Sequence, residues 1–357
     1  MSKKIVLRLW APAVLAALAV LVIAGCGSSG SSSSSTASSE TTSGGGSTSG
    51  SEASEGSGEA PKAAVLYQTV TDFTTPQVEG IEKEIDAAGG SIQEFNSNFN
   101  PQKQLEQCQD AITSGRYNVI VISAADSPSA VPCAEQAKGA GIPVVAIQNP
   151  VGKDRDKVAP QIDSVLGSAV VPQPENAELT FEIVEKACKG NSHCKLVIEM
   201  GEGSNPLDTP ELEEDAKKSS NIELVQVTEG HYNPGATAES VPQILSANPD
   251  LDVYVFESDT NALAAVAPIK EAGLSDQVKI VSDGGSTAGV EGVKKGTIYG
   301  TVAFFPITMG EEAGRMAVEA VQKGTVENDA VSMFELGEPL LIYKENAAEF
   351  EAQWGEG

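Results

Sequence analysis

Beginning at Ala63, short runs of β-branched and other aliphatic residues alternate with longer segments of helical periodicity. This alternation is typical of parallel sheets whose strands are joined by right-handed helical crossovers. A second series repeats the rhythm of the first without visible sequence identity, so the pattern predicts an α/β fold with two doubly wound parallel-sheet lobes. Strands are expected at 63–67, 91–96, 118–123 and 144–148, and then at 195–200, 222–227, 252–257 and 278–283. Helices are expected at 76–88, 101–114, 129–140, 175–189, 212–219, 236–246 and 262–272.

The N-terminus carries the strongest local signal. Three basic residues occur among the first eight positions, an apolar run spans 9–23, and small residues precede Cys26. This order predicts a secretory signal peptide over residues 1–25. Its end, VIAGC, resembles a bacterial lipobox, which implies lipidation of Cys26 and anchoring to the cell membrane on its extracytoplasmic side. A transmembrane anchor is the alternative, although the apolar run is short for a membrane span.

Residues 26–61 are expected to form a flexible linker, because they consist almost entirely of Ser, Gly, Thr, Ala and Glu. Such a segment has too little apolar surface to offset the entropy lost on ordering. Roughly 290 to 300 residues remain, which fits two domains of about 100 to 200 residues each.

Composition and motifs exclude two classes of function. The formal net charge is −27, and no cluster of Lys and Arg is present to bind nucleic-acid phosphates. The chain contains no G-x-S-x-G, H-E-x-x-H or P-loop motif and only two histidines, His193 and His231. We therefore expect neither a nucleic-acid partner nor an enzyme. Formation of a product from a bound ligand would restore the enzyme hypothesis.

Four cysteines remain after Cys26, and secretion permits disulfides. Cys188 and Cys194 are close enough to close a local loop after a helix, and Cys108 and Cys133 would then join two neighbouring helices. Three connectivities are possible in principle. The rival interpretation of Cys188, Cys194 and the nearby histidine as metal ligands lacks a fourth partner at zinc spacing, so no metal is expected.

Ligands of open parallel sheets bind beyond the carboxyl ends of the strands. The segments at those ends are richer in Asp, Asn, Ser, Thr and aromatic residues than the strands themselves. They comprise residues 69–75, 123–126, 148–149, 200–208, 229–233, 257–261 and 283–286.

With these segments in place, residues 63–340 resemble the type I solute-binding proteins of ABC transporters, and especially their ribose and sugar-binding branch. The resemblance depends on the order of several motifs rather than on any single one. They are NPQKQLEQCQDAITSGRYNVIVISAADSPSA, KGAGIPVVAIQN, DVYVFESDTNALAAVAPIKEAG, VKIVSDGG and VKKGTIYGTVAFFPITMG.

The family's binding scheme implies a set of ligand-binding residues, although each aromatic among them could instead pack in the core or hinge, and Asp283 could simply cap a helix. Gln148 and Asn149 replace the Asp-Arg pair of ribose binders, and an arginine expected early in the second lobe is missing. A neutral or cationic ligand is therefore favoured over an anionic one. The implied residues are Asp72, Phe73, Gln148, Asn149, Tyr232, Ser258, Asp259, Asp283 and Phe304.

The resemblance also implies a lobe division and a hinge made of several crossings. The first lobe is expected to contain 62–163 plus 281–304, and the second 164–280 plus 305–340. Residues 341–357 are expected to be a C-terminal tail. The lobes should close over the ligand about crossings near Asp163, Phe304 and Glu335.

The implied function is capture of a small polar, sugar-like ligand by an extracytoplasmic, membrane-anchored monomer that delivers it to an ABC permease and its ATPase. No cofactor is expected. Two alternatives remain open, namely a ligand-sensing receptor for a membrane signalling system and a binder of a non-sugar molecule such as an amino acid.

Overall fold

A computed structural model describes residues 58–200 and 209–355 of the chain. The expected signal peptide, the lipidation at Cys26 and almost all of the expected linker lie outside these ranges. None of the described helices is long and apolar enough to cross a membrane.

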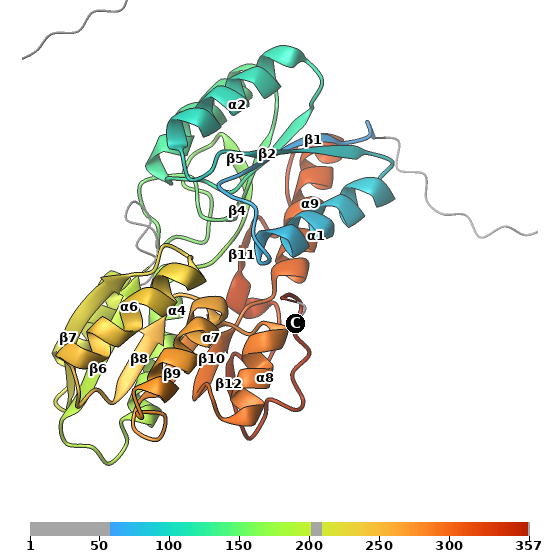
Figure 1. Cartoon of the computed structure of the whole chain (residues 1–357). Helices are drawn as coiled ribbons and strands as arrows, with labels where there is room; N and C mark the ends of the chain where they lie inside the picture. Colours follow the sequence, from blue (N-terminus) through green and yellow to red (C-terminus); the bar gives the residue numbers. More distant parts are fainter. Residues whose placement is uncertain (1–57, 201–208, 356–357) are drawn as a thin grey trace, which may run out of the picture. The chain divides into compact units, whose positions relative to one another are not determined.

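The first sheet is parallel throughout and has the strand order β11-β5-β4-β3-β1-β2. Alternate residues of each strand face opposite sides: Val65 packs with α1 and α9, whereas Leu66 packs with α2 and α3. Both faces are therefore covered by helices (Figure 1). The elements are β1 Lys62–Tyr67, β2 Ser91–Asn96, β3 Val119–Ile122, β4 Val144–Gln148, β5 Val165–Val170, β11 Ala330–Ser332, α1 Thr74–Ala87, α2 Pro101–Ser114, α3 Val131–Gly139 with a short 3₁₀ turn at Pro128–Ala130, and α9 Pro306–Lys323.

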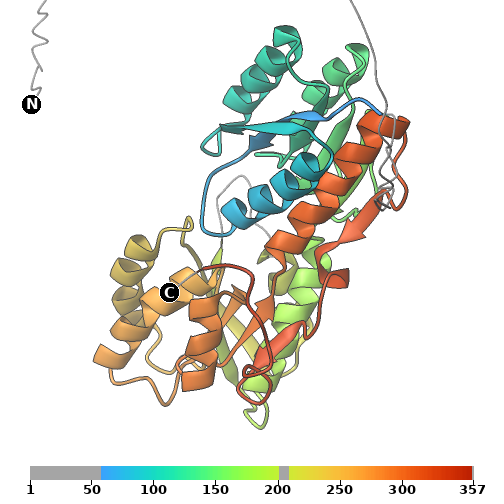
Figure 2. The same cartoon turned by 90° about the vertical axis from the view of Figure 1, so that its right-hand side faces the viewer.

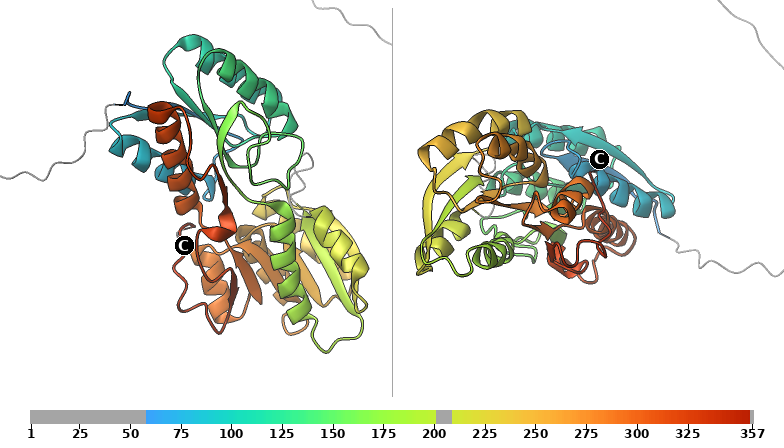
Figure 3. Two further views of the ribbon diagram at one scale, coloured as in Figure 1. Left: turned by 180° about the vertical axis from the view of Figure 1, so that it is seen from behind. Right: turned by 60° about the horizontal axis from the view of Figure 1, so that its bottom comes forward.

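The second sheet has the order β12-β10-β9-β8-β6-β7, in which only the edge strand β12 is antiparallel to its neighbour. Helix α4 lies across β8, β9 and β10 (Figure 3, left). The elements are β6 Cys194–Met200, β7 Ile222–Glu229, β8 Val253–Phe256, β9 Lys279–Gly284, β10 Gly300–Ala303, β12 Leu341–Tyr343, α4 Gln173–Ala187, α5 Thr209–Lys218, α6 Pro234–Ala247, α7 Asp259–Glu271, α8 Thr287–Lys295 and a 3₁₀ turn at Met333–Glu335. Two doubly wound sheets confirm the predicted fold class.

Strand pairing corrects the predicted lobe boundaries. Residues 281–304 were assigned to the first lobe, but β9 and β10 pair in the second sheet. Residues 164–170 and 305–332 were assigned to the second lobe, but β5 and β11 pair in the first sheet, and α9 packs beside α1. The error arises because every strand carries the same buried apolar pattern, which does not specify its sheet.

The described chain passes between the two sheets after β5, after β10 and after β11. Two of these crossings coincide with those expected near Phe304 and Glu335. The crossing expected near Asp163 is wrong, because the chain stays in the first sheet until Val170.

Helix α9 returns the chain to the first lobe and packs closely against α1 (Figure 2). Glycines make this approach possible. A Cβ at Gly310 would lie 2.1 Å from the backbone oxygen of Gln77, and one at Gly80 would lie 2.3 Å from that of Ile307. Two helices from opposite ends of the sequence are thus held in contact.

The C-terminal residues are not the tail that the sequence predicts. Strand β12 joins the second sheet, and Ala347, Phe350 and Trp354 are buried against that lobe. Their apolar side chains explain the difference, since a solvated tail would leave them exposed to water.

Both expected disulfides form. One joins Cys108 of α2 to Cys133 of α3, and the other joins Cys188, after α4, to Cys194 at the start of β6. The second bridge removes the cysteines from metal ligation, and the part of the chain that the structure describes holds no His, Cys, Asp and Glu cluster suited to a metal.

Candidate functional site

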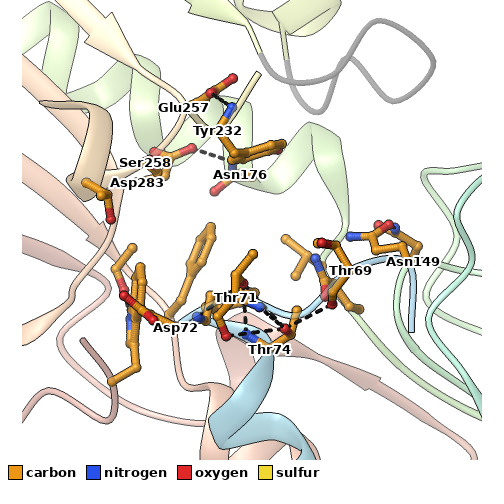
Figure 4. Close-up of a pocket in the computed structure, with 18 of the residues that line it drawn as sticks. Thr69, Thr71, Asp72, Thr74, Asn149, Asn176, Tyr232, Glu257, Ser258 and Asp283 are labelled. Carbon is orange, nitrogen blue, oxygen red and sulfur yellow. Dashed lines mark hydrogen bonds between the residues drawn. The ribbon is translucent and has the colours of Figure 1, made fainter. Parts of the chain in front are cut away.

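A cavity of about 350 Å³ lies at the carboxyl ends of strands from both sheets, where a parallel sheet places its ligands. Figure 4 shows residues of the second lobe facing those of the first across this space. Its lining includes polar and aromatic side chains from both lobes. They include Gln68, Thr69, Thr71, Asp72, Phe73, Thr74, Phe99, Gln148, Asn149, Gln173, Asn176, Tyr232, Glu257, Ser258, Thr260, Asp283, Phe304 and Trp354.

The loop between β1 and α1 brings Asp72 and Phe73 to the cavity. Its threonines fix its shape: the Thr71 N–H donates to Thr74 Oγ1 at 2.8 Å, and the Thr74 hydroxyl donates to the Thr69 carbonyl at 3.1 Å. This turn leads directly into the first residue of α1. Both predicted residues therefore line the cavity from a loop that is held by its own hydrogen bonds.

Gln148 and Asn149 line the cavity at the end of β4, also as expected. Gln148 has a φ of 63°, a left-handed conformation that is unusual for a residue with a side chain. Asn149 is buried, and its amide donates to Gln68 Oε1 at 2.8 Å and to the Ala124 carbonyl at 2.9 Å. Backbone strain and a fixed amide at one strand end are common features of binding sites.

Asp283 reaches the cavity from the end of β9 and is 5% exposed. Its two carboxylate oxygens accept hydrogen bonds of 2.8 Å from the Asn176 amide and the Thr180 hydroxyl of α4. Burial raises the pKa of Asp283 to about 7, and the nearby carboxylate of Asp259 contributes in the same direction. The two hydrogen bonds oppose this rise without cancelling it.

Asp259 is the one predicted ligand-binding residue that does not line the cavity. Its buried carboxylate accepts hydrogen bonds from the Ser282 and Thr301 hydroxyls and from both the backbone N–H and the hydroxyl of Ser286. As the first residue of α7, it is turned toward β9 and β10. The prediction is corrected on this point: Asp259 holds the loop after Asp283 in place.

The neighbouring predicted residue, Ser258, does line the cavity. Its hydroxyl also accepts a hydrogen bond of 3.2 Å from the Asn261 N–H and so caps α7. Glu257, which the sequence did not single out, lines the same wall. Its Oε1 accepts hydrogen bonds from the Asn261 amide and from the Tyr232 N–H.

One group of aromatic rings lies near the crossing between the lobes. The ring of Phe73 lies 5.6 Å from that of Phe304 and 5.2 Å from that of Trp354, measured between centroids. Phe73 and Phe304 were predicted from the sequence, but Trp354 was not. The indole donates a hydrogen bond of 2.8 Å to the Gly284 carbonyl, next to Asp283. No motif marks it, and it belongs to the segment expected to be a tail.

A second aromatic pair joins the lobes at their outer strands. Phe99, after β2, lies with its ring nearly parallel to that of Tyr232, after β7, at an angle of 8° and a centroid distance of 6.3 Å. Only Tyr232 was predicted. The sequence did hold a signal for Phe99, because Phe-Asn-Pro at 99–101 repeats as Tyr-Asn-Pro at 232–234. In both loops the aromatic residue has a positive φ and the asparagine caps the helix.

Two α/β lobes that share such a cavity at their strand ends define a two-lobe solute-binding protein. The chain belongs to the periplasmic binding protein domain family, whose model matches residues 63–325. This finding confirms the resemblance inferred from the motifs and the expectation of a binding protein rather than an enzyme.

Individual relatives agree with this assignment. The chain is 25% identical over 264 residues to the ribose import binding protein RbsB of Salmonella typhimurium, covering 73% of this chain and 84% of that protein. It is 23% identical to the D-allose-binding periplasmic protein of Escherichia coli, covering 79% and 92%. A Bacillus halodurans ABC transporter solute-binding protein with bound myo-inositol shares the fold, with a TM-score of 0.71, 19% identity, and coverage of 84% of this chain and 99% of that one.

Proposed function

We propose that this protein is the extracytoplasmic substrate-binding component of an ABC importer and that it captures a small, sugar-like ligand in the cavity between its lobes. The observation that carries the proposal is the cavity itself, which side chains from the strand ends of both sheets line together. Its volume of about 350 Å³ falls within the range of small-molecule sites. Relatives named for ribose and D-allose support a sugar-like ligand.

The lining suits a ring that carries hydroxyl groups. The rings of Phe73, Phe304 and Trp354 offer apolar faces to C–H groups, while Asp283 and Asn149 offer fixed hydrogen-bonding groups. Each ligand hydroxyl that loses water needs such a partner, because an unpaired buried polar group costs about 1 to 3 kcal/mol. Asp72, Gln148, Tyr232 and Ser258 complete the set of proposed contacts.

Ligand binding would favour a closed arrangement of the lobes. A ligand that contacts Phe73 from one lobe and Asp283 from the other stabilises the conformation in which both contacts are made. The three crossings, at residues 171–172, 304–305 and 333–340, would absorb the change in backbone torsions. A permease could then distinguish loaded from empty protein by its shape.

The proposed location is supported by the N-terminal sequence, whose end resembles a lipobox. Lipidation of Cys26 would hold the protein on the membrane through the linker at 26–61, beside the permease and its ATPase, and it would act as a monomer. Cys26→Ala should release the protein from the membrane fraction. Retention of that variant with the membranes would contradict the anchor.

Binding is tested by isothermal titration of the purified protein with aldoses, polyols and amino acids. We expect one molecule of a sugar or polyol to bind per chain. Phe73→Ala should weaken binding at least tenfold, whereas His193→Ala, on an exposed loop, should not. Binding of amino acids alone would refute the sugar-like ligand but leave the transport role intact.

Uptake of the labelled ligand distinguishes import from sensing. Deletion of the gene should abolish uptake by intact cells. Unchanged uptake together with a lost transcriptional response would favour the signalling alternative.

A further inference from the structure

The charges around the cavity are unbalanced. Three carboxylates line it, those of Asp72, Glu257 and Asp283, and the described lining residues include no Lys, Arg or His. Residues 201–208, between the two described ranges, likewise contain no basic residue in the sequence. Among the described residues that line the cavity, a ligand beside Asp72 or Asp283 therefore meets no basic side chain.

Asp283 is the most constrained of these carboxylates. It is almost completely buried, and the donors that it has in the structure, Asn176 and Thr180, are neutral. A buried carboxylate normally either pairs with a cation or takes up a proton. The raised pKa of Asp283 indicates that its neutral donors do not offset its loss of hydration.

Closure of the lobes would increase the free-energy cost of keeping these carboxylates ionised. Asp72 is exposed in the structure and faces the same cavity, so a ligand that displaces water would leave Asp72 and Asp283 in a medium of lower dielectric constant. A neutral sugar supplies hydroxyl donors but no charge. An ammonium group supplies three donors and a positive charge at once.

The aromatic rings favour the same chemistry. Phe73, Phe304 and Trp354 lie together on the cavity wall, and the Trp354 indole is fixed next to Asp283 by its bond to Gly284. The face of an aromatic ring attracts an organic cation, most strongly in the case of tryptophan. A bare metal ion suits the site less well, because the described residues hold no group of three acidic, His or Cys ligands arranged for one.

We infer that the ligand is a polyhydroxylated compound with a positively charged amine, such as an amino sugar or amino-substituted polyol, and that its ammonium group is bound at Asp283. This inference rests on the proposed function and narrows its ligand class. The hydroxyl groups would be bound by the amides and hydroxyls of both lobes, and the apolar face of the ring would lie on Phe73 and Trp354.

The test compares matched pairs of ligands that differ only by an amine in place of a hydroxyl. The full chain, purified in detergent at pH 7.5, is titrated with D-glucose and D-glucosamine, with D-galactose and D-galactosamine, and with myo-inositol and an amino-deoxy-inositol. We expect the amine of at least one pair to bind at least tenfold more tightly than its hydroxyl partner. N-acetyl-D-glucosamine, which keeps the nitrogen but loses the charge, should lose that advantage.

Variants locate the effect. Asp283→Asn should reduce the preference for the amine to less than threefold. Asp126→Asn is the matched control, since Asp126 caps the turn at Ser129 and does not line the cavity, and it should keep the full preference. Should Asp283→Asn fail to fold, the ligand pairs on the unmodified protein still decide the question.

The outcomes separate the two proposals. Equal or tighter binding of the hydroxyl partners would refute the inference that the ligand carries an amine, but it would leave the proposed sugar-binding function intact. An amine preference that survives Asp283→Asn would overturn the placement at Asp283. Binding of amino acids alone, or of no member of any pair, would count against both the inference and the sugar-like ligand.

Discussion

Replacing Asp283 by asparagine should make the ligand-free protein more stable at alkaline pH. The carboxylate is buried with neutral donors, and burial raises its pKa from the ordinary value of 3.8 to about 7. Between these two pH values the folded protein binds more protons than the unfolded chain, so stability falls as the pH rises. Asparagine has nearly the same shape and carries no charge, and the Thr180 hydroxyl can either donate to it or accept from it.

The size of the effect follows from the two pKa values. Compared with a side chain that stays neutral in both states, a carboxylate with this pKa shift lowers the free energy of unfolding by about 2 kcal/mol at pH 5 and about 4 kcal/mol at pH 8. The penalty is complete above the folded pKa of Asp283 and disappears below the unfolded one. The stability of Asp283→Asn relative to the unmodified protein should therefore rise by about 2 to 3 kcal/mol between pH 5 and pH 8.

Urea unfolding of both proteins at the two pH values measures this difference. The fluorescence of Trp354 is a local probe, because its indole bonds to Gly284 beside the substituted residue. Comparing the difference between variants across pH cancels the shared titrating groups that do not interact with Asp283, which leaves Asp283 and its neighbour Asp259. Parallel pH profiles would refute the reasoning, because they would mean that Asp283 titrates alike in the folded and unfolded chains.

Further predictions concern the cavity wall, a disulfide and the packing of two helices. Trp354→Ala should weaken ligand binding at least tenfold by calorimetry, and Trp354→Phe less, because the ring forms part of the wall; equal affinity of all three proteins would contradict this. Replacing both Cys108 and Cys133 by alanine should lower the unfolding free energy in urea by about 3 kcal/mol, since the bridge spans 25 residues; an unchanged midpoint would contradict it. Gly310→Ala should destabilise the protein by about 1 to 3 kcal/mol in thermal unfolding, because its Cβ would lie 2.1 Å from a backbone oxygen of α1, whereas Gly139→Ala, with no atom within 4 Å, should be tolerated.

The sequence predicted the strands and helices well, but it did not predict which of the two sheets each strand joins. All eight expected strands are present, because a buried strand and an amphipathic helix each impose their own hydrophobic period. Residues 300–303 and 330–332 carry the same apolar character, yet they join different sheets. The sheet that a strand joins depends on long-range packing, here of α9 against α1, and the hydrophobic periodicity of a short segment contains no information about such packing.

The candidate site was predictable where it depends on strand ends. Asp72 lies in the loop after β1, Gln148 is the last residue of β4 and Asp283 is the second-to-last residue of β9, so the topology brings all three to one cavity. The prediction for Asp259 was wrong because consecutive residues at the start of a helix point in different directions. Ser258 lines the cavity, whereas the next residue, Asp259, faces away from it. Trp354 was missed because it reaches the cavity through a C-terminal segment that has no regular pattern.

The position of a bound ligand tests the central claim most directly. A crystal structure of the protein with the tightest-binding compound from the titrations should show it between Phe73 of one lobe and Asp283 of the other, in contact with both. A ligand that contacts only one sheet, or one that lies outside this cavity, would contradict the proposed mechanism of capture.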